Sequence, residues 1–229
     1  MIAGLVVFSI AFGYVEAAVV AYLRSIYAPI RLRFFPAEVA KELFPLLSLE
    51  QLRSLGTEHI ARLKTELGRE LATMLMLGGV ALAATRKLRE WTAAFLICFG
   101  IWDIAFYVFL RLLLDWPASL FTWDILFLVP VPWTGPVIAP VIVSASMIVC
   151  GFIVMWRESE GRPVQITRAQ AALIVMGGAV IVAAFIWDFR NTATGGNPNS
   201  FQWVIFWIGE AIGLLGFAGS LRIQQSPSR

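Results

Sequence analysis

Six stretches of mostly apolar residues recur along the chain, and each is long enough to cross a lipid bilayer as a helix. They cover residues 2–23, 58–85, 91–114, 137–156, 171–187 and 201–217. A helix of twenty residues is about 30 Å long, which matches the hydrocarbon core of a membrane. The chain is 59% hydrophobic and only 14% charged, against about 45–50% and 25% in soluble domains. The sequence therefore predicts an all-α integral membrane protein, with residues 1–229 forming one helical bundle.

A seventh apolar segment, 118–131, is too short to be assigned in the same way. It contains Asp124 and ends at Pro130, and about fourteen residues of helix reach only ~21 Å. The segment is either re-entrant or a seventh span. With six spans, the basic loops at 86–89 and 157–170 share one side with both termini, which the positive-inside rule places in the cytoplasm. With seven spans the N-terminus lies outside, and the charges around the first span favour that arrangement.

The region after the first span, 36–66, is too polar to cross a membrane. Pro36 can open a short helix over 37–44, and Ser48 with Gln51 forms a capping-box pattern for a second one that stops near Gly56. Thr57 can cap a third helix, which continues into the second span. These pieces carry leucines on one side and lysine, arginine and glutamate on the other, so we expect amphipathic helices on the membrane surface. A small soluble cap is the alternative.

Four carboxylates lie inside the apolar segments: Glu16, Glu70, Asp103 and Asp124. Counting residues from the helix ends puts all four in the same half of the bilayer under either topology. A charge at the centre of a membrane helix costs at least ~2.5–3.5 kcal/mol, so these side chains should face each other, an arginine, water or a cation. The four residues are the candidates for catalytic groups, proton carriers or metal ligands.

Candidate binding groups for an anionic substrate lie near the acids: Arg24, Arg69, Arg111 and Tyr14. Three interpretations are open. The arginines pair with the acids and lock the bundle, or the acids form a proton or cation pathway. In the third interpretation, the acids bind a hard divalent cation such as magnesium, calcium or manganese, which accepts oxygen ligands. The bound cation would then serve chemistry on a lipid-like substrate.

Several other functions find no support in the sequence. No basic run is suited to a phosphate backbone, so we expect no nucleic acid partner. The single histidine, His59, excludes a haem held by two histidines and any histidine-rich metal site built by this chain alone. The motifs of serine hydrolases, zinc proteases, P-loops and dinucleotide folds are absent from the sequence. The glycine pairs 78–79 and 177–178 are predicted to be sites of close helix packing.

Three runs of the sequence resemble an uncharacterised family of bacterial polytopic inner-membrane proteins: Tyr14–Arg24, Gly68–Thr73 and Trp116–Asp124. The resemblance implies a multi-pass protein of the bacterial inner (cytoplasmic) membrane, and it implies no activity. Our hypothesis is a carboxylate-rich intramembrane cavity that binds a cation or protons, for transport or for chemistry on a lipid-like substrate. The alternative is a non-catalytic structural subunit of a larger membrane complex. The expected partners are the lipid bilayer, other membrane proteins or further copies of the chain.

Overall fold

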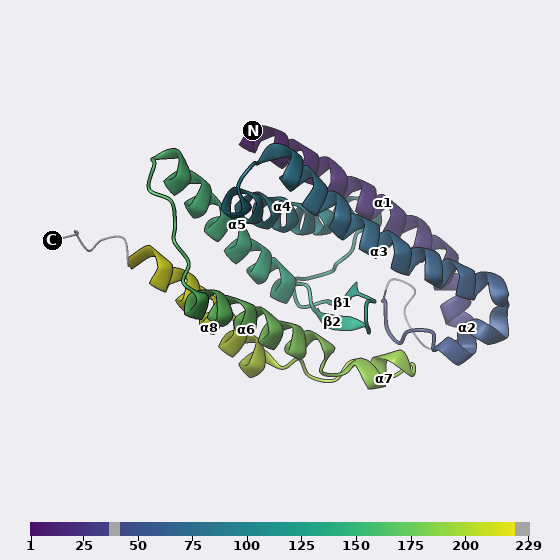
Figure 1. The fold of residues 1–229 in the computed structure, drawn as a ribbon. Coiled ribbons are helices and arrows are strands. Elements are labelled where there is room, and N and C mark those ends of the chain that lie inside the picture. Colours follow the sequence, from purple (N-terminus) through teal and green to yellow (C-terminus); the bar gives the residue numbers. More distant parts are fainter. Residues whose placement is uncertain (37–41, 223–229) are drawn as a thin grey trace.

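A computed structural model describes residues 1–36 and 42–222 of the chain (Figure 1). Its elements are α1 (Ile2–Phe34), α2 (Leu49–Leu55), α3 (Thr57–Ala84), α4 (Leu88–Leu114), β1 (Trp123–Phe127), β2 (Trp133–Pro136), α5 (Ile138–Ser159), α6 (Arg168–Ile186), α7 (Phe189–Ala193) and α8 (Trp203–Arg222). Six of these helices, α1, α3, α4, α5, α6 and α8, are long and apolar enough to cross a membrane. The prediction of an all-α membrane protein with six spans is confirmed.

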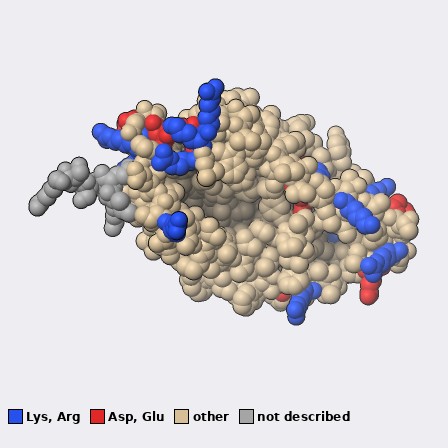
Figure 2. Space-filling model, in the orientation of Figure 1, with Lys and Arg blue, Asp and Glu red and all other residues tan. Residues whose placement is uncertain are grey.

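The six long helices form two groups that meet at α5 (Figure 1). Helix α4 packs along both α1 and α5, and α3 lies beside α1 and α4. Helices α6 and α8 form a tight pair, and α5 lies between this pair and α4. Charged side chains gather toward two ends of the molecule, and the face between them is nearly free of them (Figure 2). This distribution fits a bundle whose middle lies in hydrocarbon.

Small residues allow the helices of each pair to approach closely. An added Cβ at Gly177 of α6 would lie 2.5 Å from the backbone nitrogen of Gly213 and 2.6 Å from the oxygen of Gly209, both in α8. By contrast, an added Cβ at Gly178 or Gly79 would meet no atom within 4 Å. At Gly78 it would meet only the Trp91 side chain, at 4.0 Å, which is ordinary contact. The predicted close packing is thus confirmed for Gly177 and not found at Gly78, Gly79 or Gly178.

Helix α1 is longer than the sequence predicted. The basic residues after Leu23 indicated an end of the helix there, but it continues to Phe34 and carries Pro29 in its interior. The 33 residues span roughly 50 Å, so its last three turns extend beyond a hydrocarbon core of about 30 Å. Protein contacts stabilise this extension, since Arg31 donates to the carbonyl oxygen of Phe44 at 2.9 Å.

Segment 118–131 forms no helix, and the seventh-span alternative is wrong for this structure. Strands β1 and β2 form an antiparallel hairpin in which Asp124 pairs with Gly135. Pro130 and Pro132 lack the amide hydrogens that a helix needs and lie in the connection between the strands. The hairpin packs on α5 and α6. Non-helical backbone is tolerated at membrane depth where protein covers it.

The region after α1 agrees with the sequence in part. Ser48 and Gln51 form the predicted capping box at the start of α2. The predicted short helix over 37–44 falls largely outside the described residues, and its described part, 42–44, is not helical. Helix α3 runs over Thr57–Ala84 as expected, but Gly56 takes the N-cap position that we assigned to Thr57.

Candidate functional site

Three of the four predicted acids line one small cavity of about 30 Å³. Glu16 comes from α1, Glu70 from α3 and Asp103 from α4, and each is less than a tenth exposed. Three different helices therefore bring carboxylates to the same cavity. The cavity is completed by neighbours on the same helices and by the end of β1: Arg69, Thr73, Trp102, Phe106, Tyr107, Leu126 and Phe127.

Glu16 has a cationic partner. Its carboxylate forms an ion pair with Arg69, and it also accepts a hydrogen bond from the hydroxyl of Thr73 at 3.3 Å. Arg69 in turn binds Glu66, one turn earlier on α3, with Nε 3.0 Å from both carboxylate oxygens. Arg69 was a candidate for binding an anionic substrate, and here it bridges two carboxylates of the protein.

Among the described residues, Glu70 and Asp103 have no cationic partner. The carboxylate of Glu70 accepts from the backbone N–H of Leu128, with N···O distances of 3.0 and 2.9 Å. Asp103 accepts from the hydroxyl of Ser144 on α5 at 2.8 Å. Over residues 1–36 and 42–222, neither carboxylate takes part in an ion pair. Both negative charges would thus be held in the bundle by neutral donors.

Asp124 lies one side chain away from the cavity. The hydroxyl of Tyr107, which lines the cavity, donates to Asp124 at 3.1 Å. The guanidinium of Arg24 lies 3.6 Å from the other carboxylate oxygen of Asp124, and 3.6 Å above the centre of the Trp116 ring. The hairpin therefore brings Asp124 beside the other acids, although not into the same cavity.

Two further candidates lie away from these residues. Arg111 donates to the backbone oxygens of Asp115 and Pro117 and forms an ion pair with Asp115, so it holds the end of α4. Tyr14 is about half exposed on α1 and packs edge-on against Phe109. A fifth intramembrane acid, Glu210 on α8, is buried and accepts from Ser146 on α5, and it does not line the cavity.

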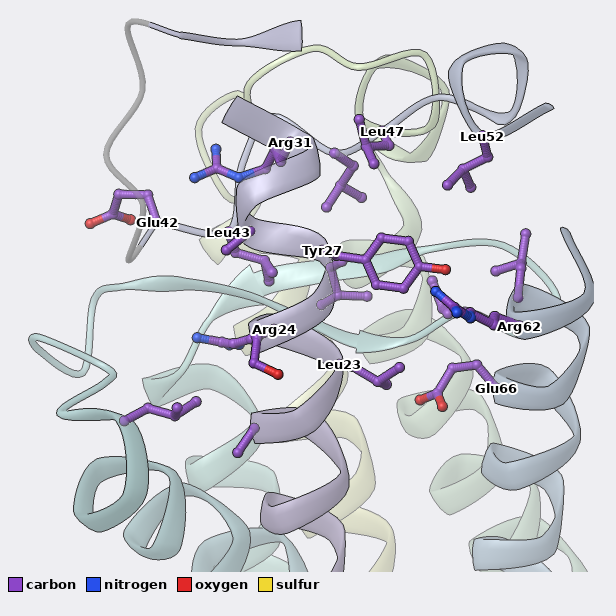
Figure 3. Close-up of a pocket in the computed structure, with 18 of the residues that line it drawn as sticks. Leu23, Arg24, Tyr27, Arg31, Glu42, Leu43, Leu47, Leu52, Arg62 and Glu66 are labelled. Atoms are coloured by element: carbon purple, nitrogen blue, oxygen red, sulfur yellow. The ribbon is translucent and has the colours of Figure 1, made fainter. Parts of the chain in front are cut away.

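A second cavity is much larger, with a volume of about 450 Å³. Figure 3 shows residues that line it. The cavity is partly open, and its walls come from the last turns of α1, the segment leading into α2, α2 itself, the start of α3, the end of α4 with the loop that follows it, and the hairpin. The two cavities share a wall, since Leu128 lines the larger one while its N–H binds Glu70 of the smaller one. The sequence pointed to amphipathic helices in this region, but periodicity alone does not show that they close around a cavity.

Several buried N–H donors at these cavities lack an acceptor among the described residues. The donors are the indole N–H of Trp102, a residue that lines the smaller cavity, and the indole N–H of Trp116 and Nε of Arg24, two residues that line the larger one. An unpaired buried donor costs about 1–3 kcal/mol, so such groups indicate places where water or a ligand binds.

The described residues do not form a set of ligands for a metal ion. Across the part of the chain that the structure describes, no three side chains of histidine, cysteine, aspartate or glutamate converge to hold one. Glu16, Glu70, Asp103 and Asp124 instead each accept a hydrogen bond from a protein group. Proton transfer between carboxylates needs no such convergence.

Comparisons of the chain with models of protein families, with curated proteins and with solved structures found no match, so its function has to be inferred from the geometry of these residues.

Proposed function

We propose that the protein is a proton pathway of the membrane, in which Glu70 and Asp103 carry the proton. One observation supports this more than any other: both carboxylates line the same cavity inside the bundle, and neither is paired with a cation among the described residues. On the resemblance of its sequence, we place the protein in the bacterial cytoplasmic membrane.

The cost of burying a charge sets the protonation state of acids inside the bundle. An unpaired carboxylate is strongly disfavoured at membrane depth, whereas the neutral acid is tolerated. Glu70 and Asp103 can each change between these forms by gaining or losing one proton. Two such groups at one cavity can pass a proton from one to the other, and the charge then moves without a metal ion or a bound cation.

The cavity has the size and the polar groups for a bridging water. Its volume of about 30 Å³ exceeds the ~10–15 Å³ that one water molecule requires. A water there would accept from the unpaired indole N–H of Trp102 and donate to the carboxylates of Glu70 and Asp103. Such a water would relay a proton between the two acids.

The neighbouring residues extend this route in one direction. Tyr107 lines the cavity and donates to Asp124, and Asp124 in turn meets Arg24 at the wall of the larger cavity. A proton leaving Asp103 could follow these groups toward the larger cavity. The ion pair between Glu16 and Arg69 stays charged in this scheme and contributes a fixed field beside the pathway.

The proposal is tested by proton flux into liposomes. The purified protein is reconstituted with a pH-sensitive dye inside, and a potassium gradient with valinomycin drives protons inward. We expect flux well above that of protein-free liposomes, and Glu70→Gln or Asp103→Asn should lower it at least tenfold. Glu210→Gln is the matched control, because it removes a buried intramembrane carboxylate that lies outside the cavity.

Two outcomes would overturn the proposal. One is native protein that moves protons no faster than protein-free liposomes. The other is flux that is equally fast in Glu70→Gln and Asp103→Asn, with size-exclusion profiles showing that all variants are folded. Either result would favour the rival function, a structural subunit of a larger membrane complex, in which these acids serve only to hold the helices together.

A further inference from the structure

We infer that the larger cavity binds a single-chain amphiphile with an anionic oxygen head, either the carboxylate of a fatty acid or the phosphate of a lysolipid. This inference concerns a second site and does not depend on the proton pathway. It rests on the volume and apolar walls of the cavity, on its place along the helices, and on the unpaired donors at one end.

The walls suit an alkyl chain. Leucines from four separate segments line the cavity: Leu23 from α1, Leu46 from the connecting segment, Leu52 from α2 and Leu63 from α3. A volume of about 450 Å³ falls within the roughly 300–1,000 Å³ of small-molecule sites. This space is sufficient for one alkyl chain.

The position of the cavity along the helices matches the membrane interface. On α1 the lining residues run from Ala21 to Arg31, beyond the ~20 residues that cross the hydrocarbon core. On α3 they are Arg62, Leu63 and Glu66, all within the first three turns of a 28-residue helix of about 42 Å. The cavity therefore lies near the level of lipid head groups, where an amphiphile can enter without leaving the membrane.

Two donors without an acceptor define the place of the head group. Among the described residues, Nε of Arg24 and the indole N–H of Trp116 have no hydrogen-bond partner, and both residues line the cavity. Trp116 is only 2% exposed, so bulk water does not satisfy its N–H. The two groups lie together, since the guanidinium stacks 3.6 Å above the indole ring. An oxygen acceptor bound there would satisfy both.

The charges of the lining favour an anionic acceptor over a neutral one. Arginines outnumber acids in the lining, with Arg24, Arg31 and Arg62 against Glu42 and Glu66. Behind the lining, Arg69 binds Glu66 and Asp124 lies 3.6 Å from Arg24, so the two added charges cancel and the balance stays positive. Figure 3 shows Arg24 and Arg31 extending on the side of α1 where Glu42 lies, whereas Leu23 and Tyr27 face Arg62 and Glu66 of α3. Hydrogen bonds that involve an ion are about twice as strong as neutral ones.

The test uses a photoreactive oleate analogue with a diazirine on its chain and native protein in phosphatidylcholine nanodiscs. After irradiation, mass spectrometry should place the label on cavity residues of α1, α2 and α3. Excess oleate or lysophosphatidate should prevent labelling, and the stronger competitor identifies the head as carboxylate or phosphate. Monoolein, with the same chain and an uncharged head, should compete at least tenfold more weakly.

Three variants locate the ligand within the cavity. Trp116→Phe removes the N–H and keeps the ring, and it should weaken binding about tenfold, as expected for one charge-assisted hydrogen bond. Trp133→Phe is the matched control, because its indole N–H is also buried and unpaired but lies outside this cavity. Leu23→Trp fills the cavity and should abolish labelling there.

Each part of the inference can be contradicted by a different result. Labels confined to lipid-facing side chains and unaffected by Leu23→Trp would overturn the site. Equal binding by Trp116→Phe and Trp133→Phe would overturn the assignment of the head group, and equal competition by monoolein would overturn the anionic class. None of these measurements depends on proton flux, so a failure of the proton pathway leaves them unaffected.

Discussion

The backbone N–H of Leu128 donates to both carboxylate oxygens of Glu70, at 3.0 and 2.9 Å. Leu128 directly follows β1, whereas Glu70 lies in α3, nearly sixty residues earlier in the chain. This contact fixes the end of the hairpin against a spanning helix. It also places a wall residue of the larger cavity in direct contact with an acid of the smaller cavity.

The first prediction concerns this contact. Glu70→Ala leaves the Leu128 N–H without an acceptor, which should lower the free energy of unfolding by about 1–3 kcal/mol. Glu70→Gln keeps an oxygen acceptor and should cost less than about 1 kcal/mol. Chemical unfolding in detergent measures both, and hydrogen exchange at the Leu128 amide should accelerate only in Glu70→Ala. Equal exchange in the two variants would contradict the assigned bond.

The second prediction concerns the ion pair between Glu16 and Arg69. Glu16 is 7% exposed, so Arg69→Gln should lower the free energy of unfolding by about 3 kcal/mol, since it leaves a buried carboxylate unpaired. The double variant Glu16→Gln with Arg69→Gln should recover much of that loss. Arg111→Gln is the control, because the side chains of Arg111 and Asp115 are 52% and 67% exposed and such pairs contribute about 0–1 kcal/mol. Additive losses in the double-mutant cycle would show that the pair is not coupled.

The third prediction distinguishes two adjacent glycines. Gly177→Ala would place a Cβ 2.5 Å from the backbone of Gly213 and should force α6 and α8 apart, at a cost of about 1–3 kcal/mol. Gly178→Ala meets no atom within 4 Å and should be neutral or slightly stabilising. Thermal unfolding in detergent compares the two variants. If both lower the melting temperature equally, the packing of α6 on α8 differs from the one described.

The fourth prediction concerns pH and the loop after α6. Burial raises the pKa of Asp188, but hydrogen bonds from the Asn199 backbone and from the Asn191 and Asn199 side chains outweigh it and bring the pKa below its ordinary value. A lowered pKa in the folded state adds stability above the ordinary value of about 3.9, and this stability is lost as the pH falls through the lower folded pKa. Asp188→Asn should therefore be less stable than native protein at pH 7, and the difference should shrink as the pH falls below the ordinary pKa of aspartate.

The Asn199 amide gives an independent measurement of the same effect. Its NMR signal should titrate together with the Asp188 carboxyl group, with a midpoint below that of an unstructured aspartate. A stability difference between Asp188→Asn and native protein that is the same at pH 7 and at pH 3 would contradict this role.

Much of the fold follows from apolar runs and local signals. Twenty apolar residues in a row can bury their surface in lipid only as a helix, because each backbone group must then bond within its own segment. The six spans follow from this rule, as does the capping box of Ser48 and Gln51, which depends only on residues three positions apart. The same rule predicted a wrong end for α1 and predicted no definite structure for residues 118–131. In both regions the chain is stabilised by contacts with distant segments instead of by lipid.

For the acids, the sequence predicts only a similar depth in the membrane and does not predict which of them lie together. Residue counting along helices of known rise puts Glu16, Glu70 and Asp103 at similar heights, but it cannot say which helix faces which. The order of packing, α3 and α4 against α1, depends on side-chain shapes that no single segment contains. The hairpin that brings Asp124 to Tyr107 depends likewise on cross-strand pairing.

By itself, the sequence determined that this chain is a helical membrane protein with several spans and that it carries acids to one level within it. Hydrophobic length and the cost of a buried charge are local properties, and they are sufficient for both conclusions. Only the tertiary structure decided which acids have cations. Arg69 pairs with Glu16 and Arg24 meets Asp124, whereas Glu70 and Asp103 meet neutral donors. That difference depends on how neighbouring helices are rotated and packed, and it decides where a proton could be carried.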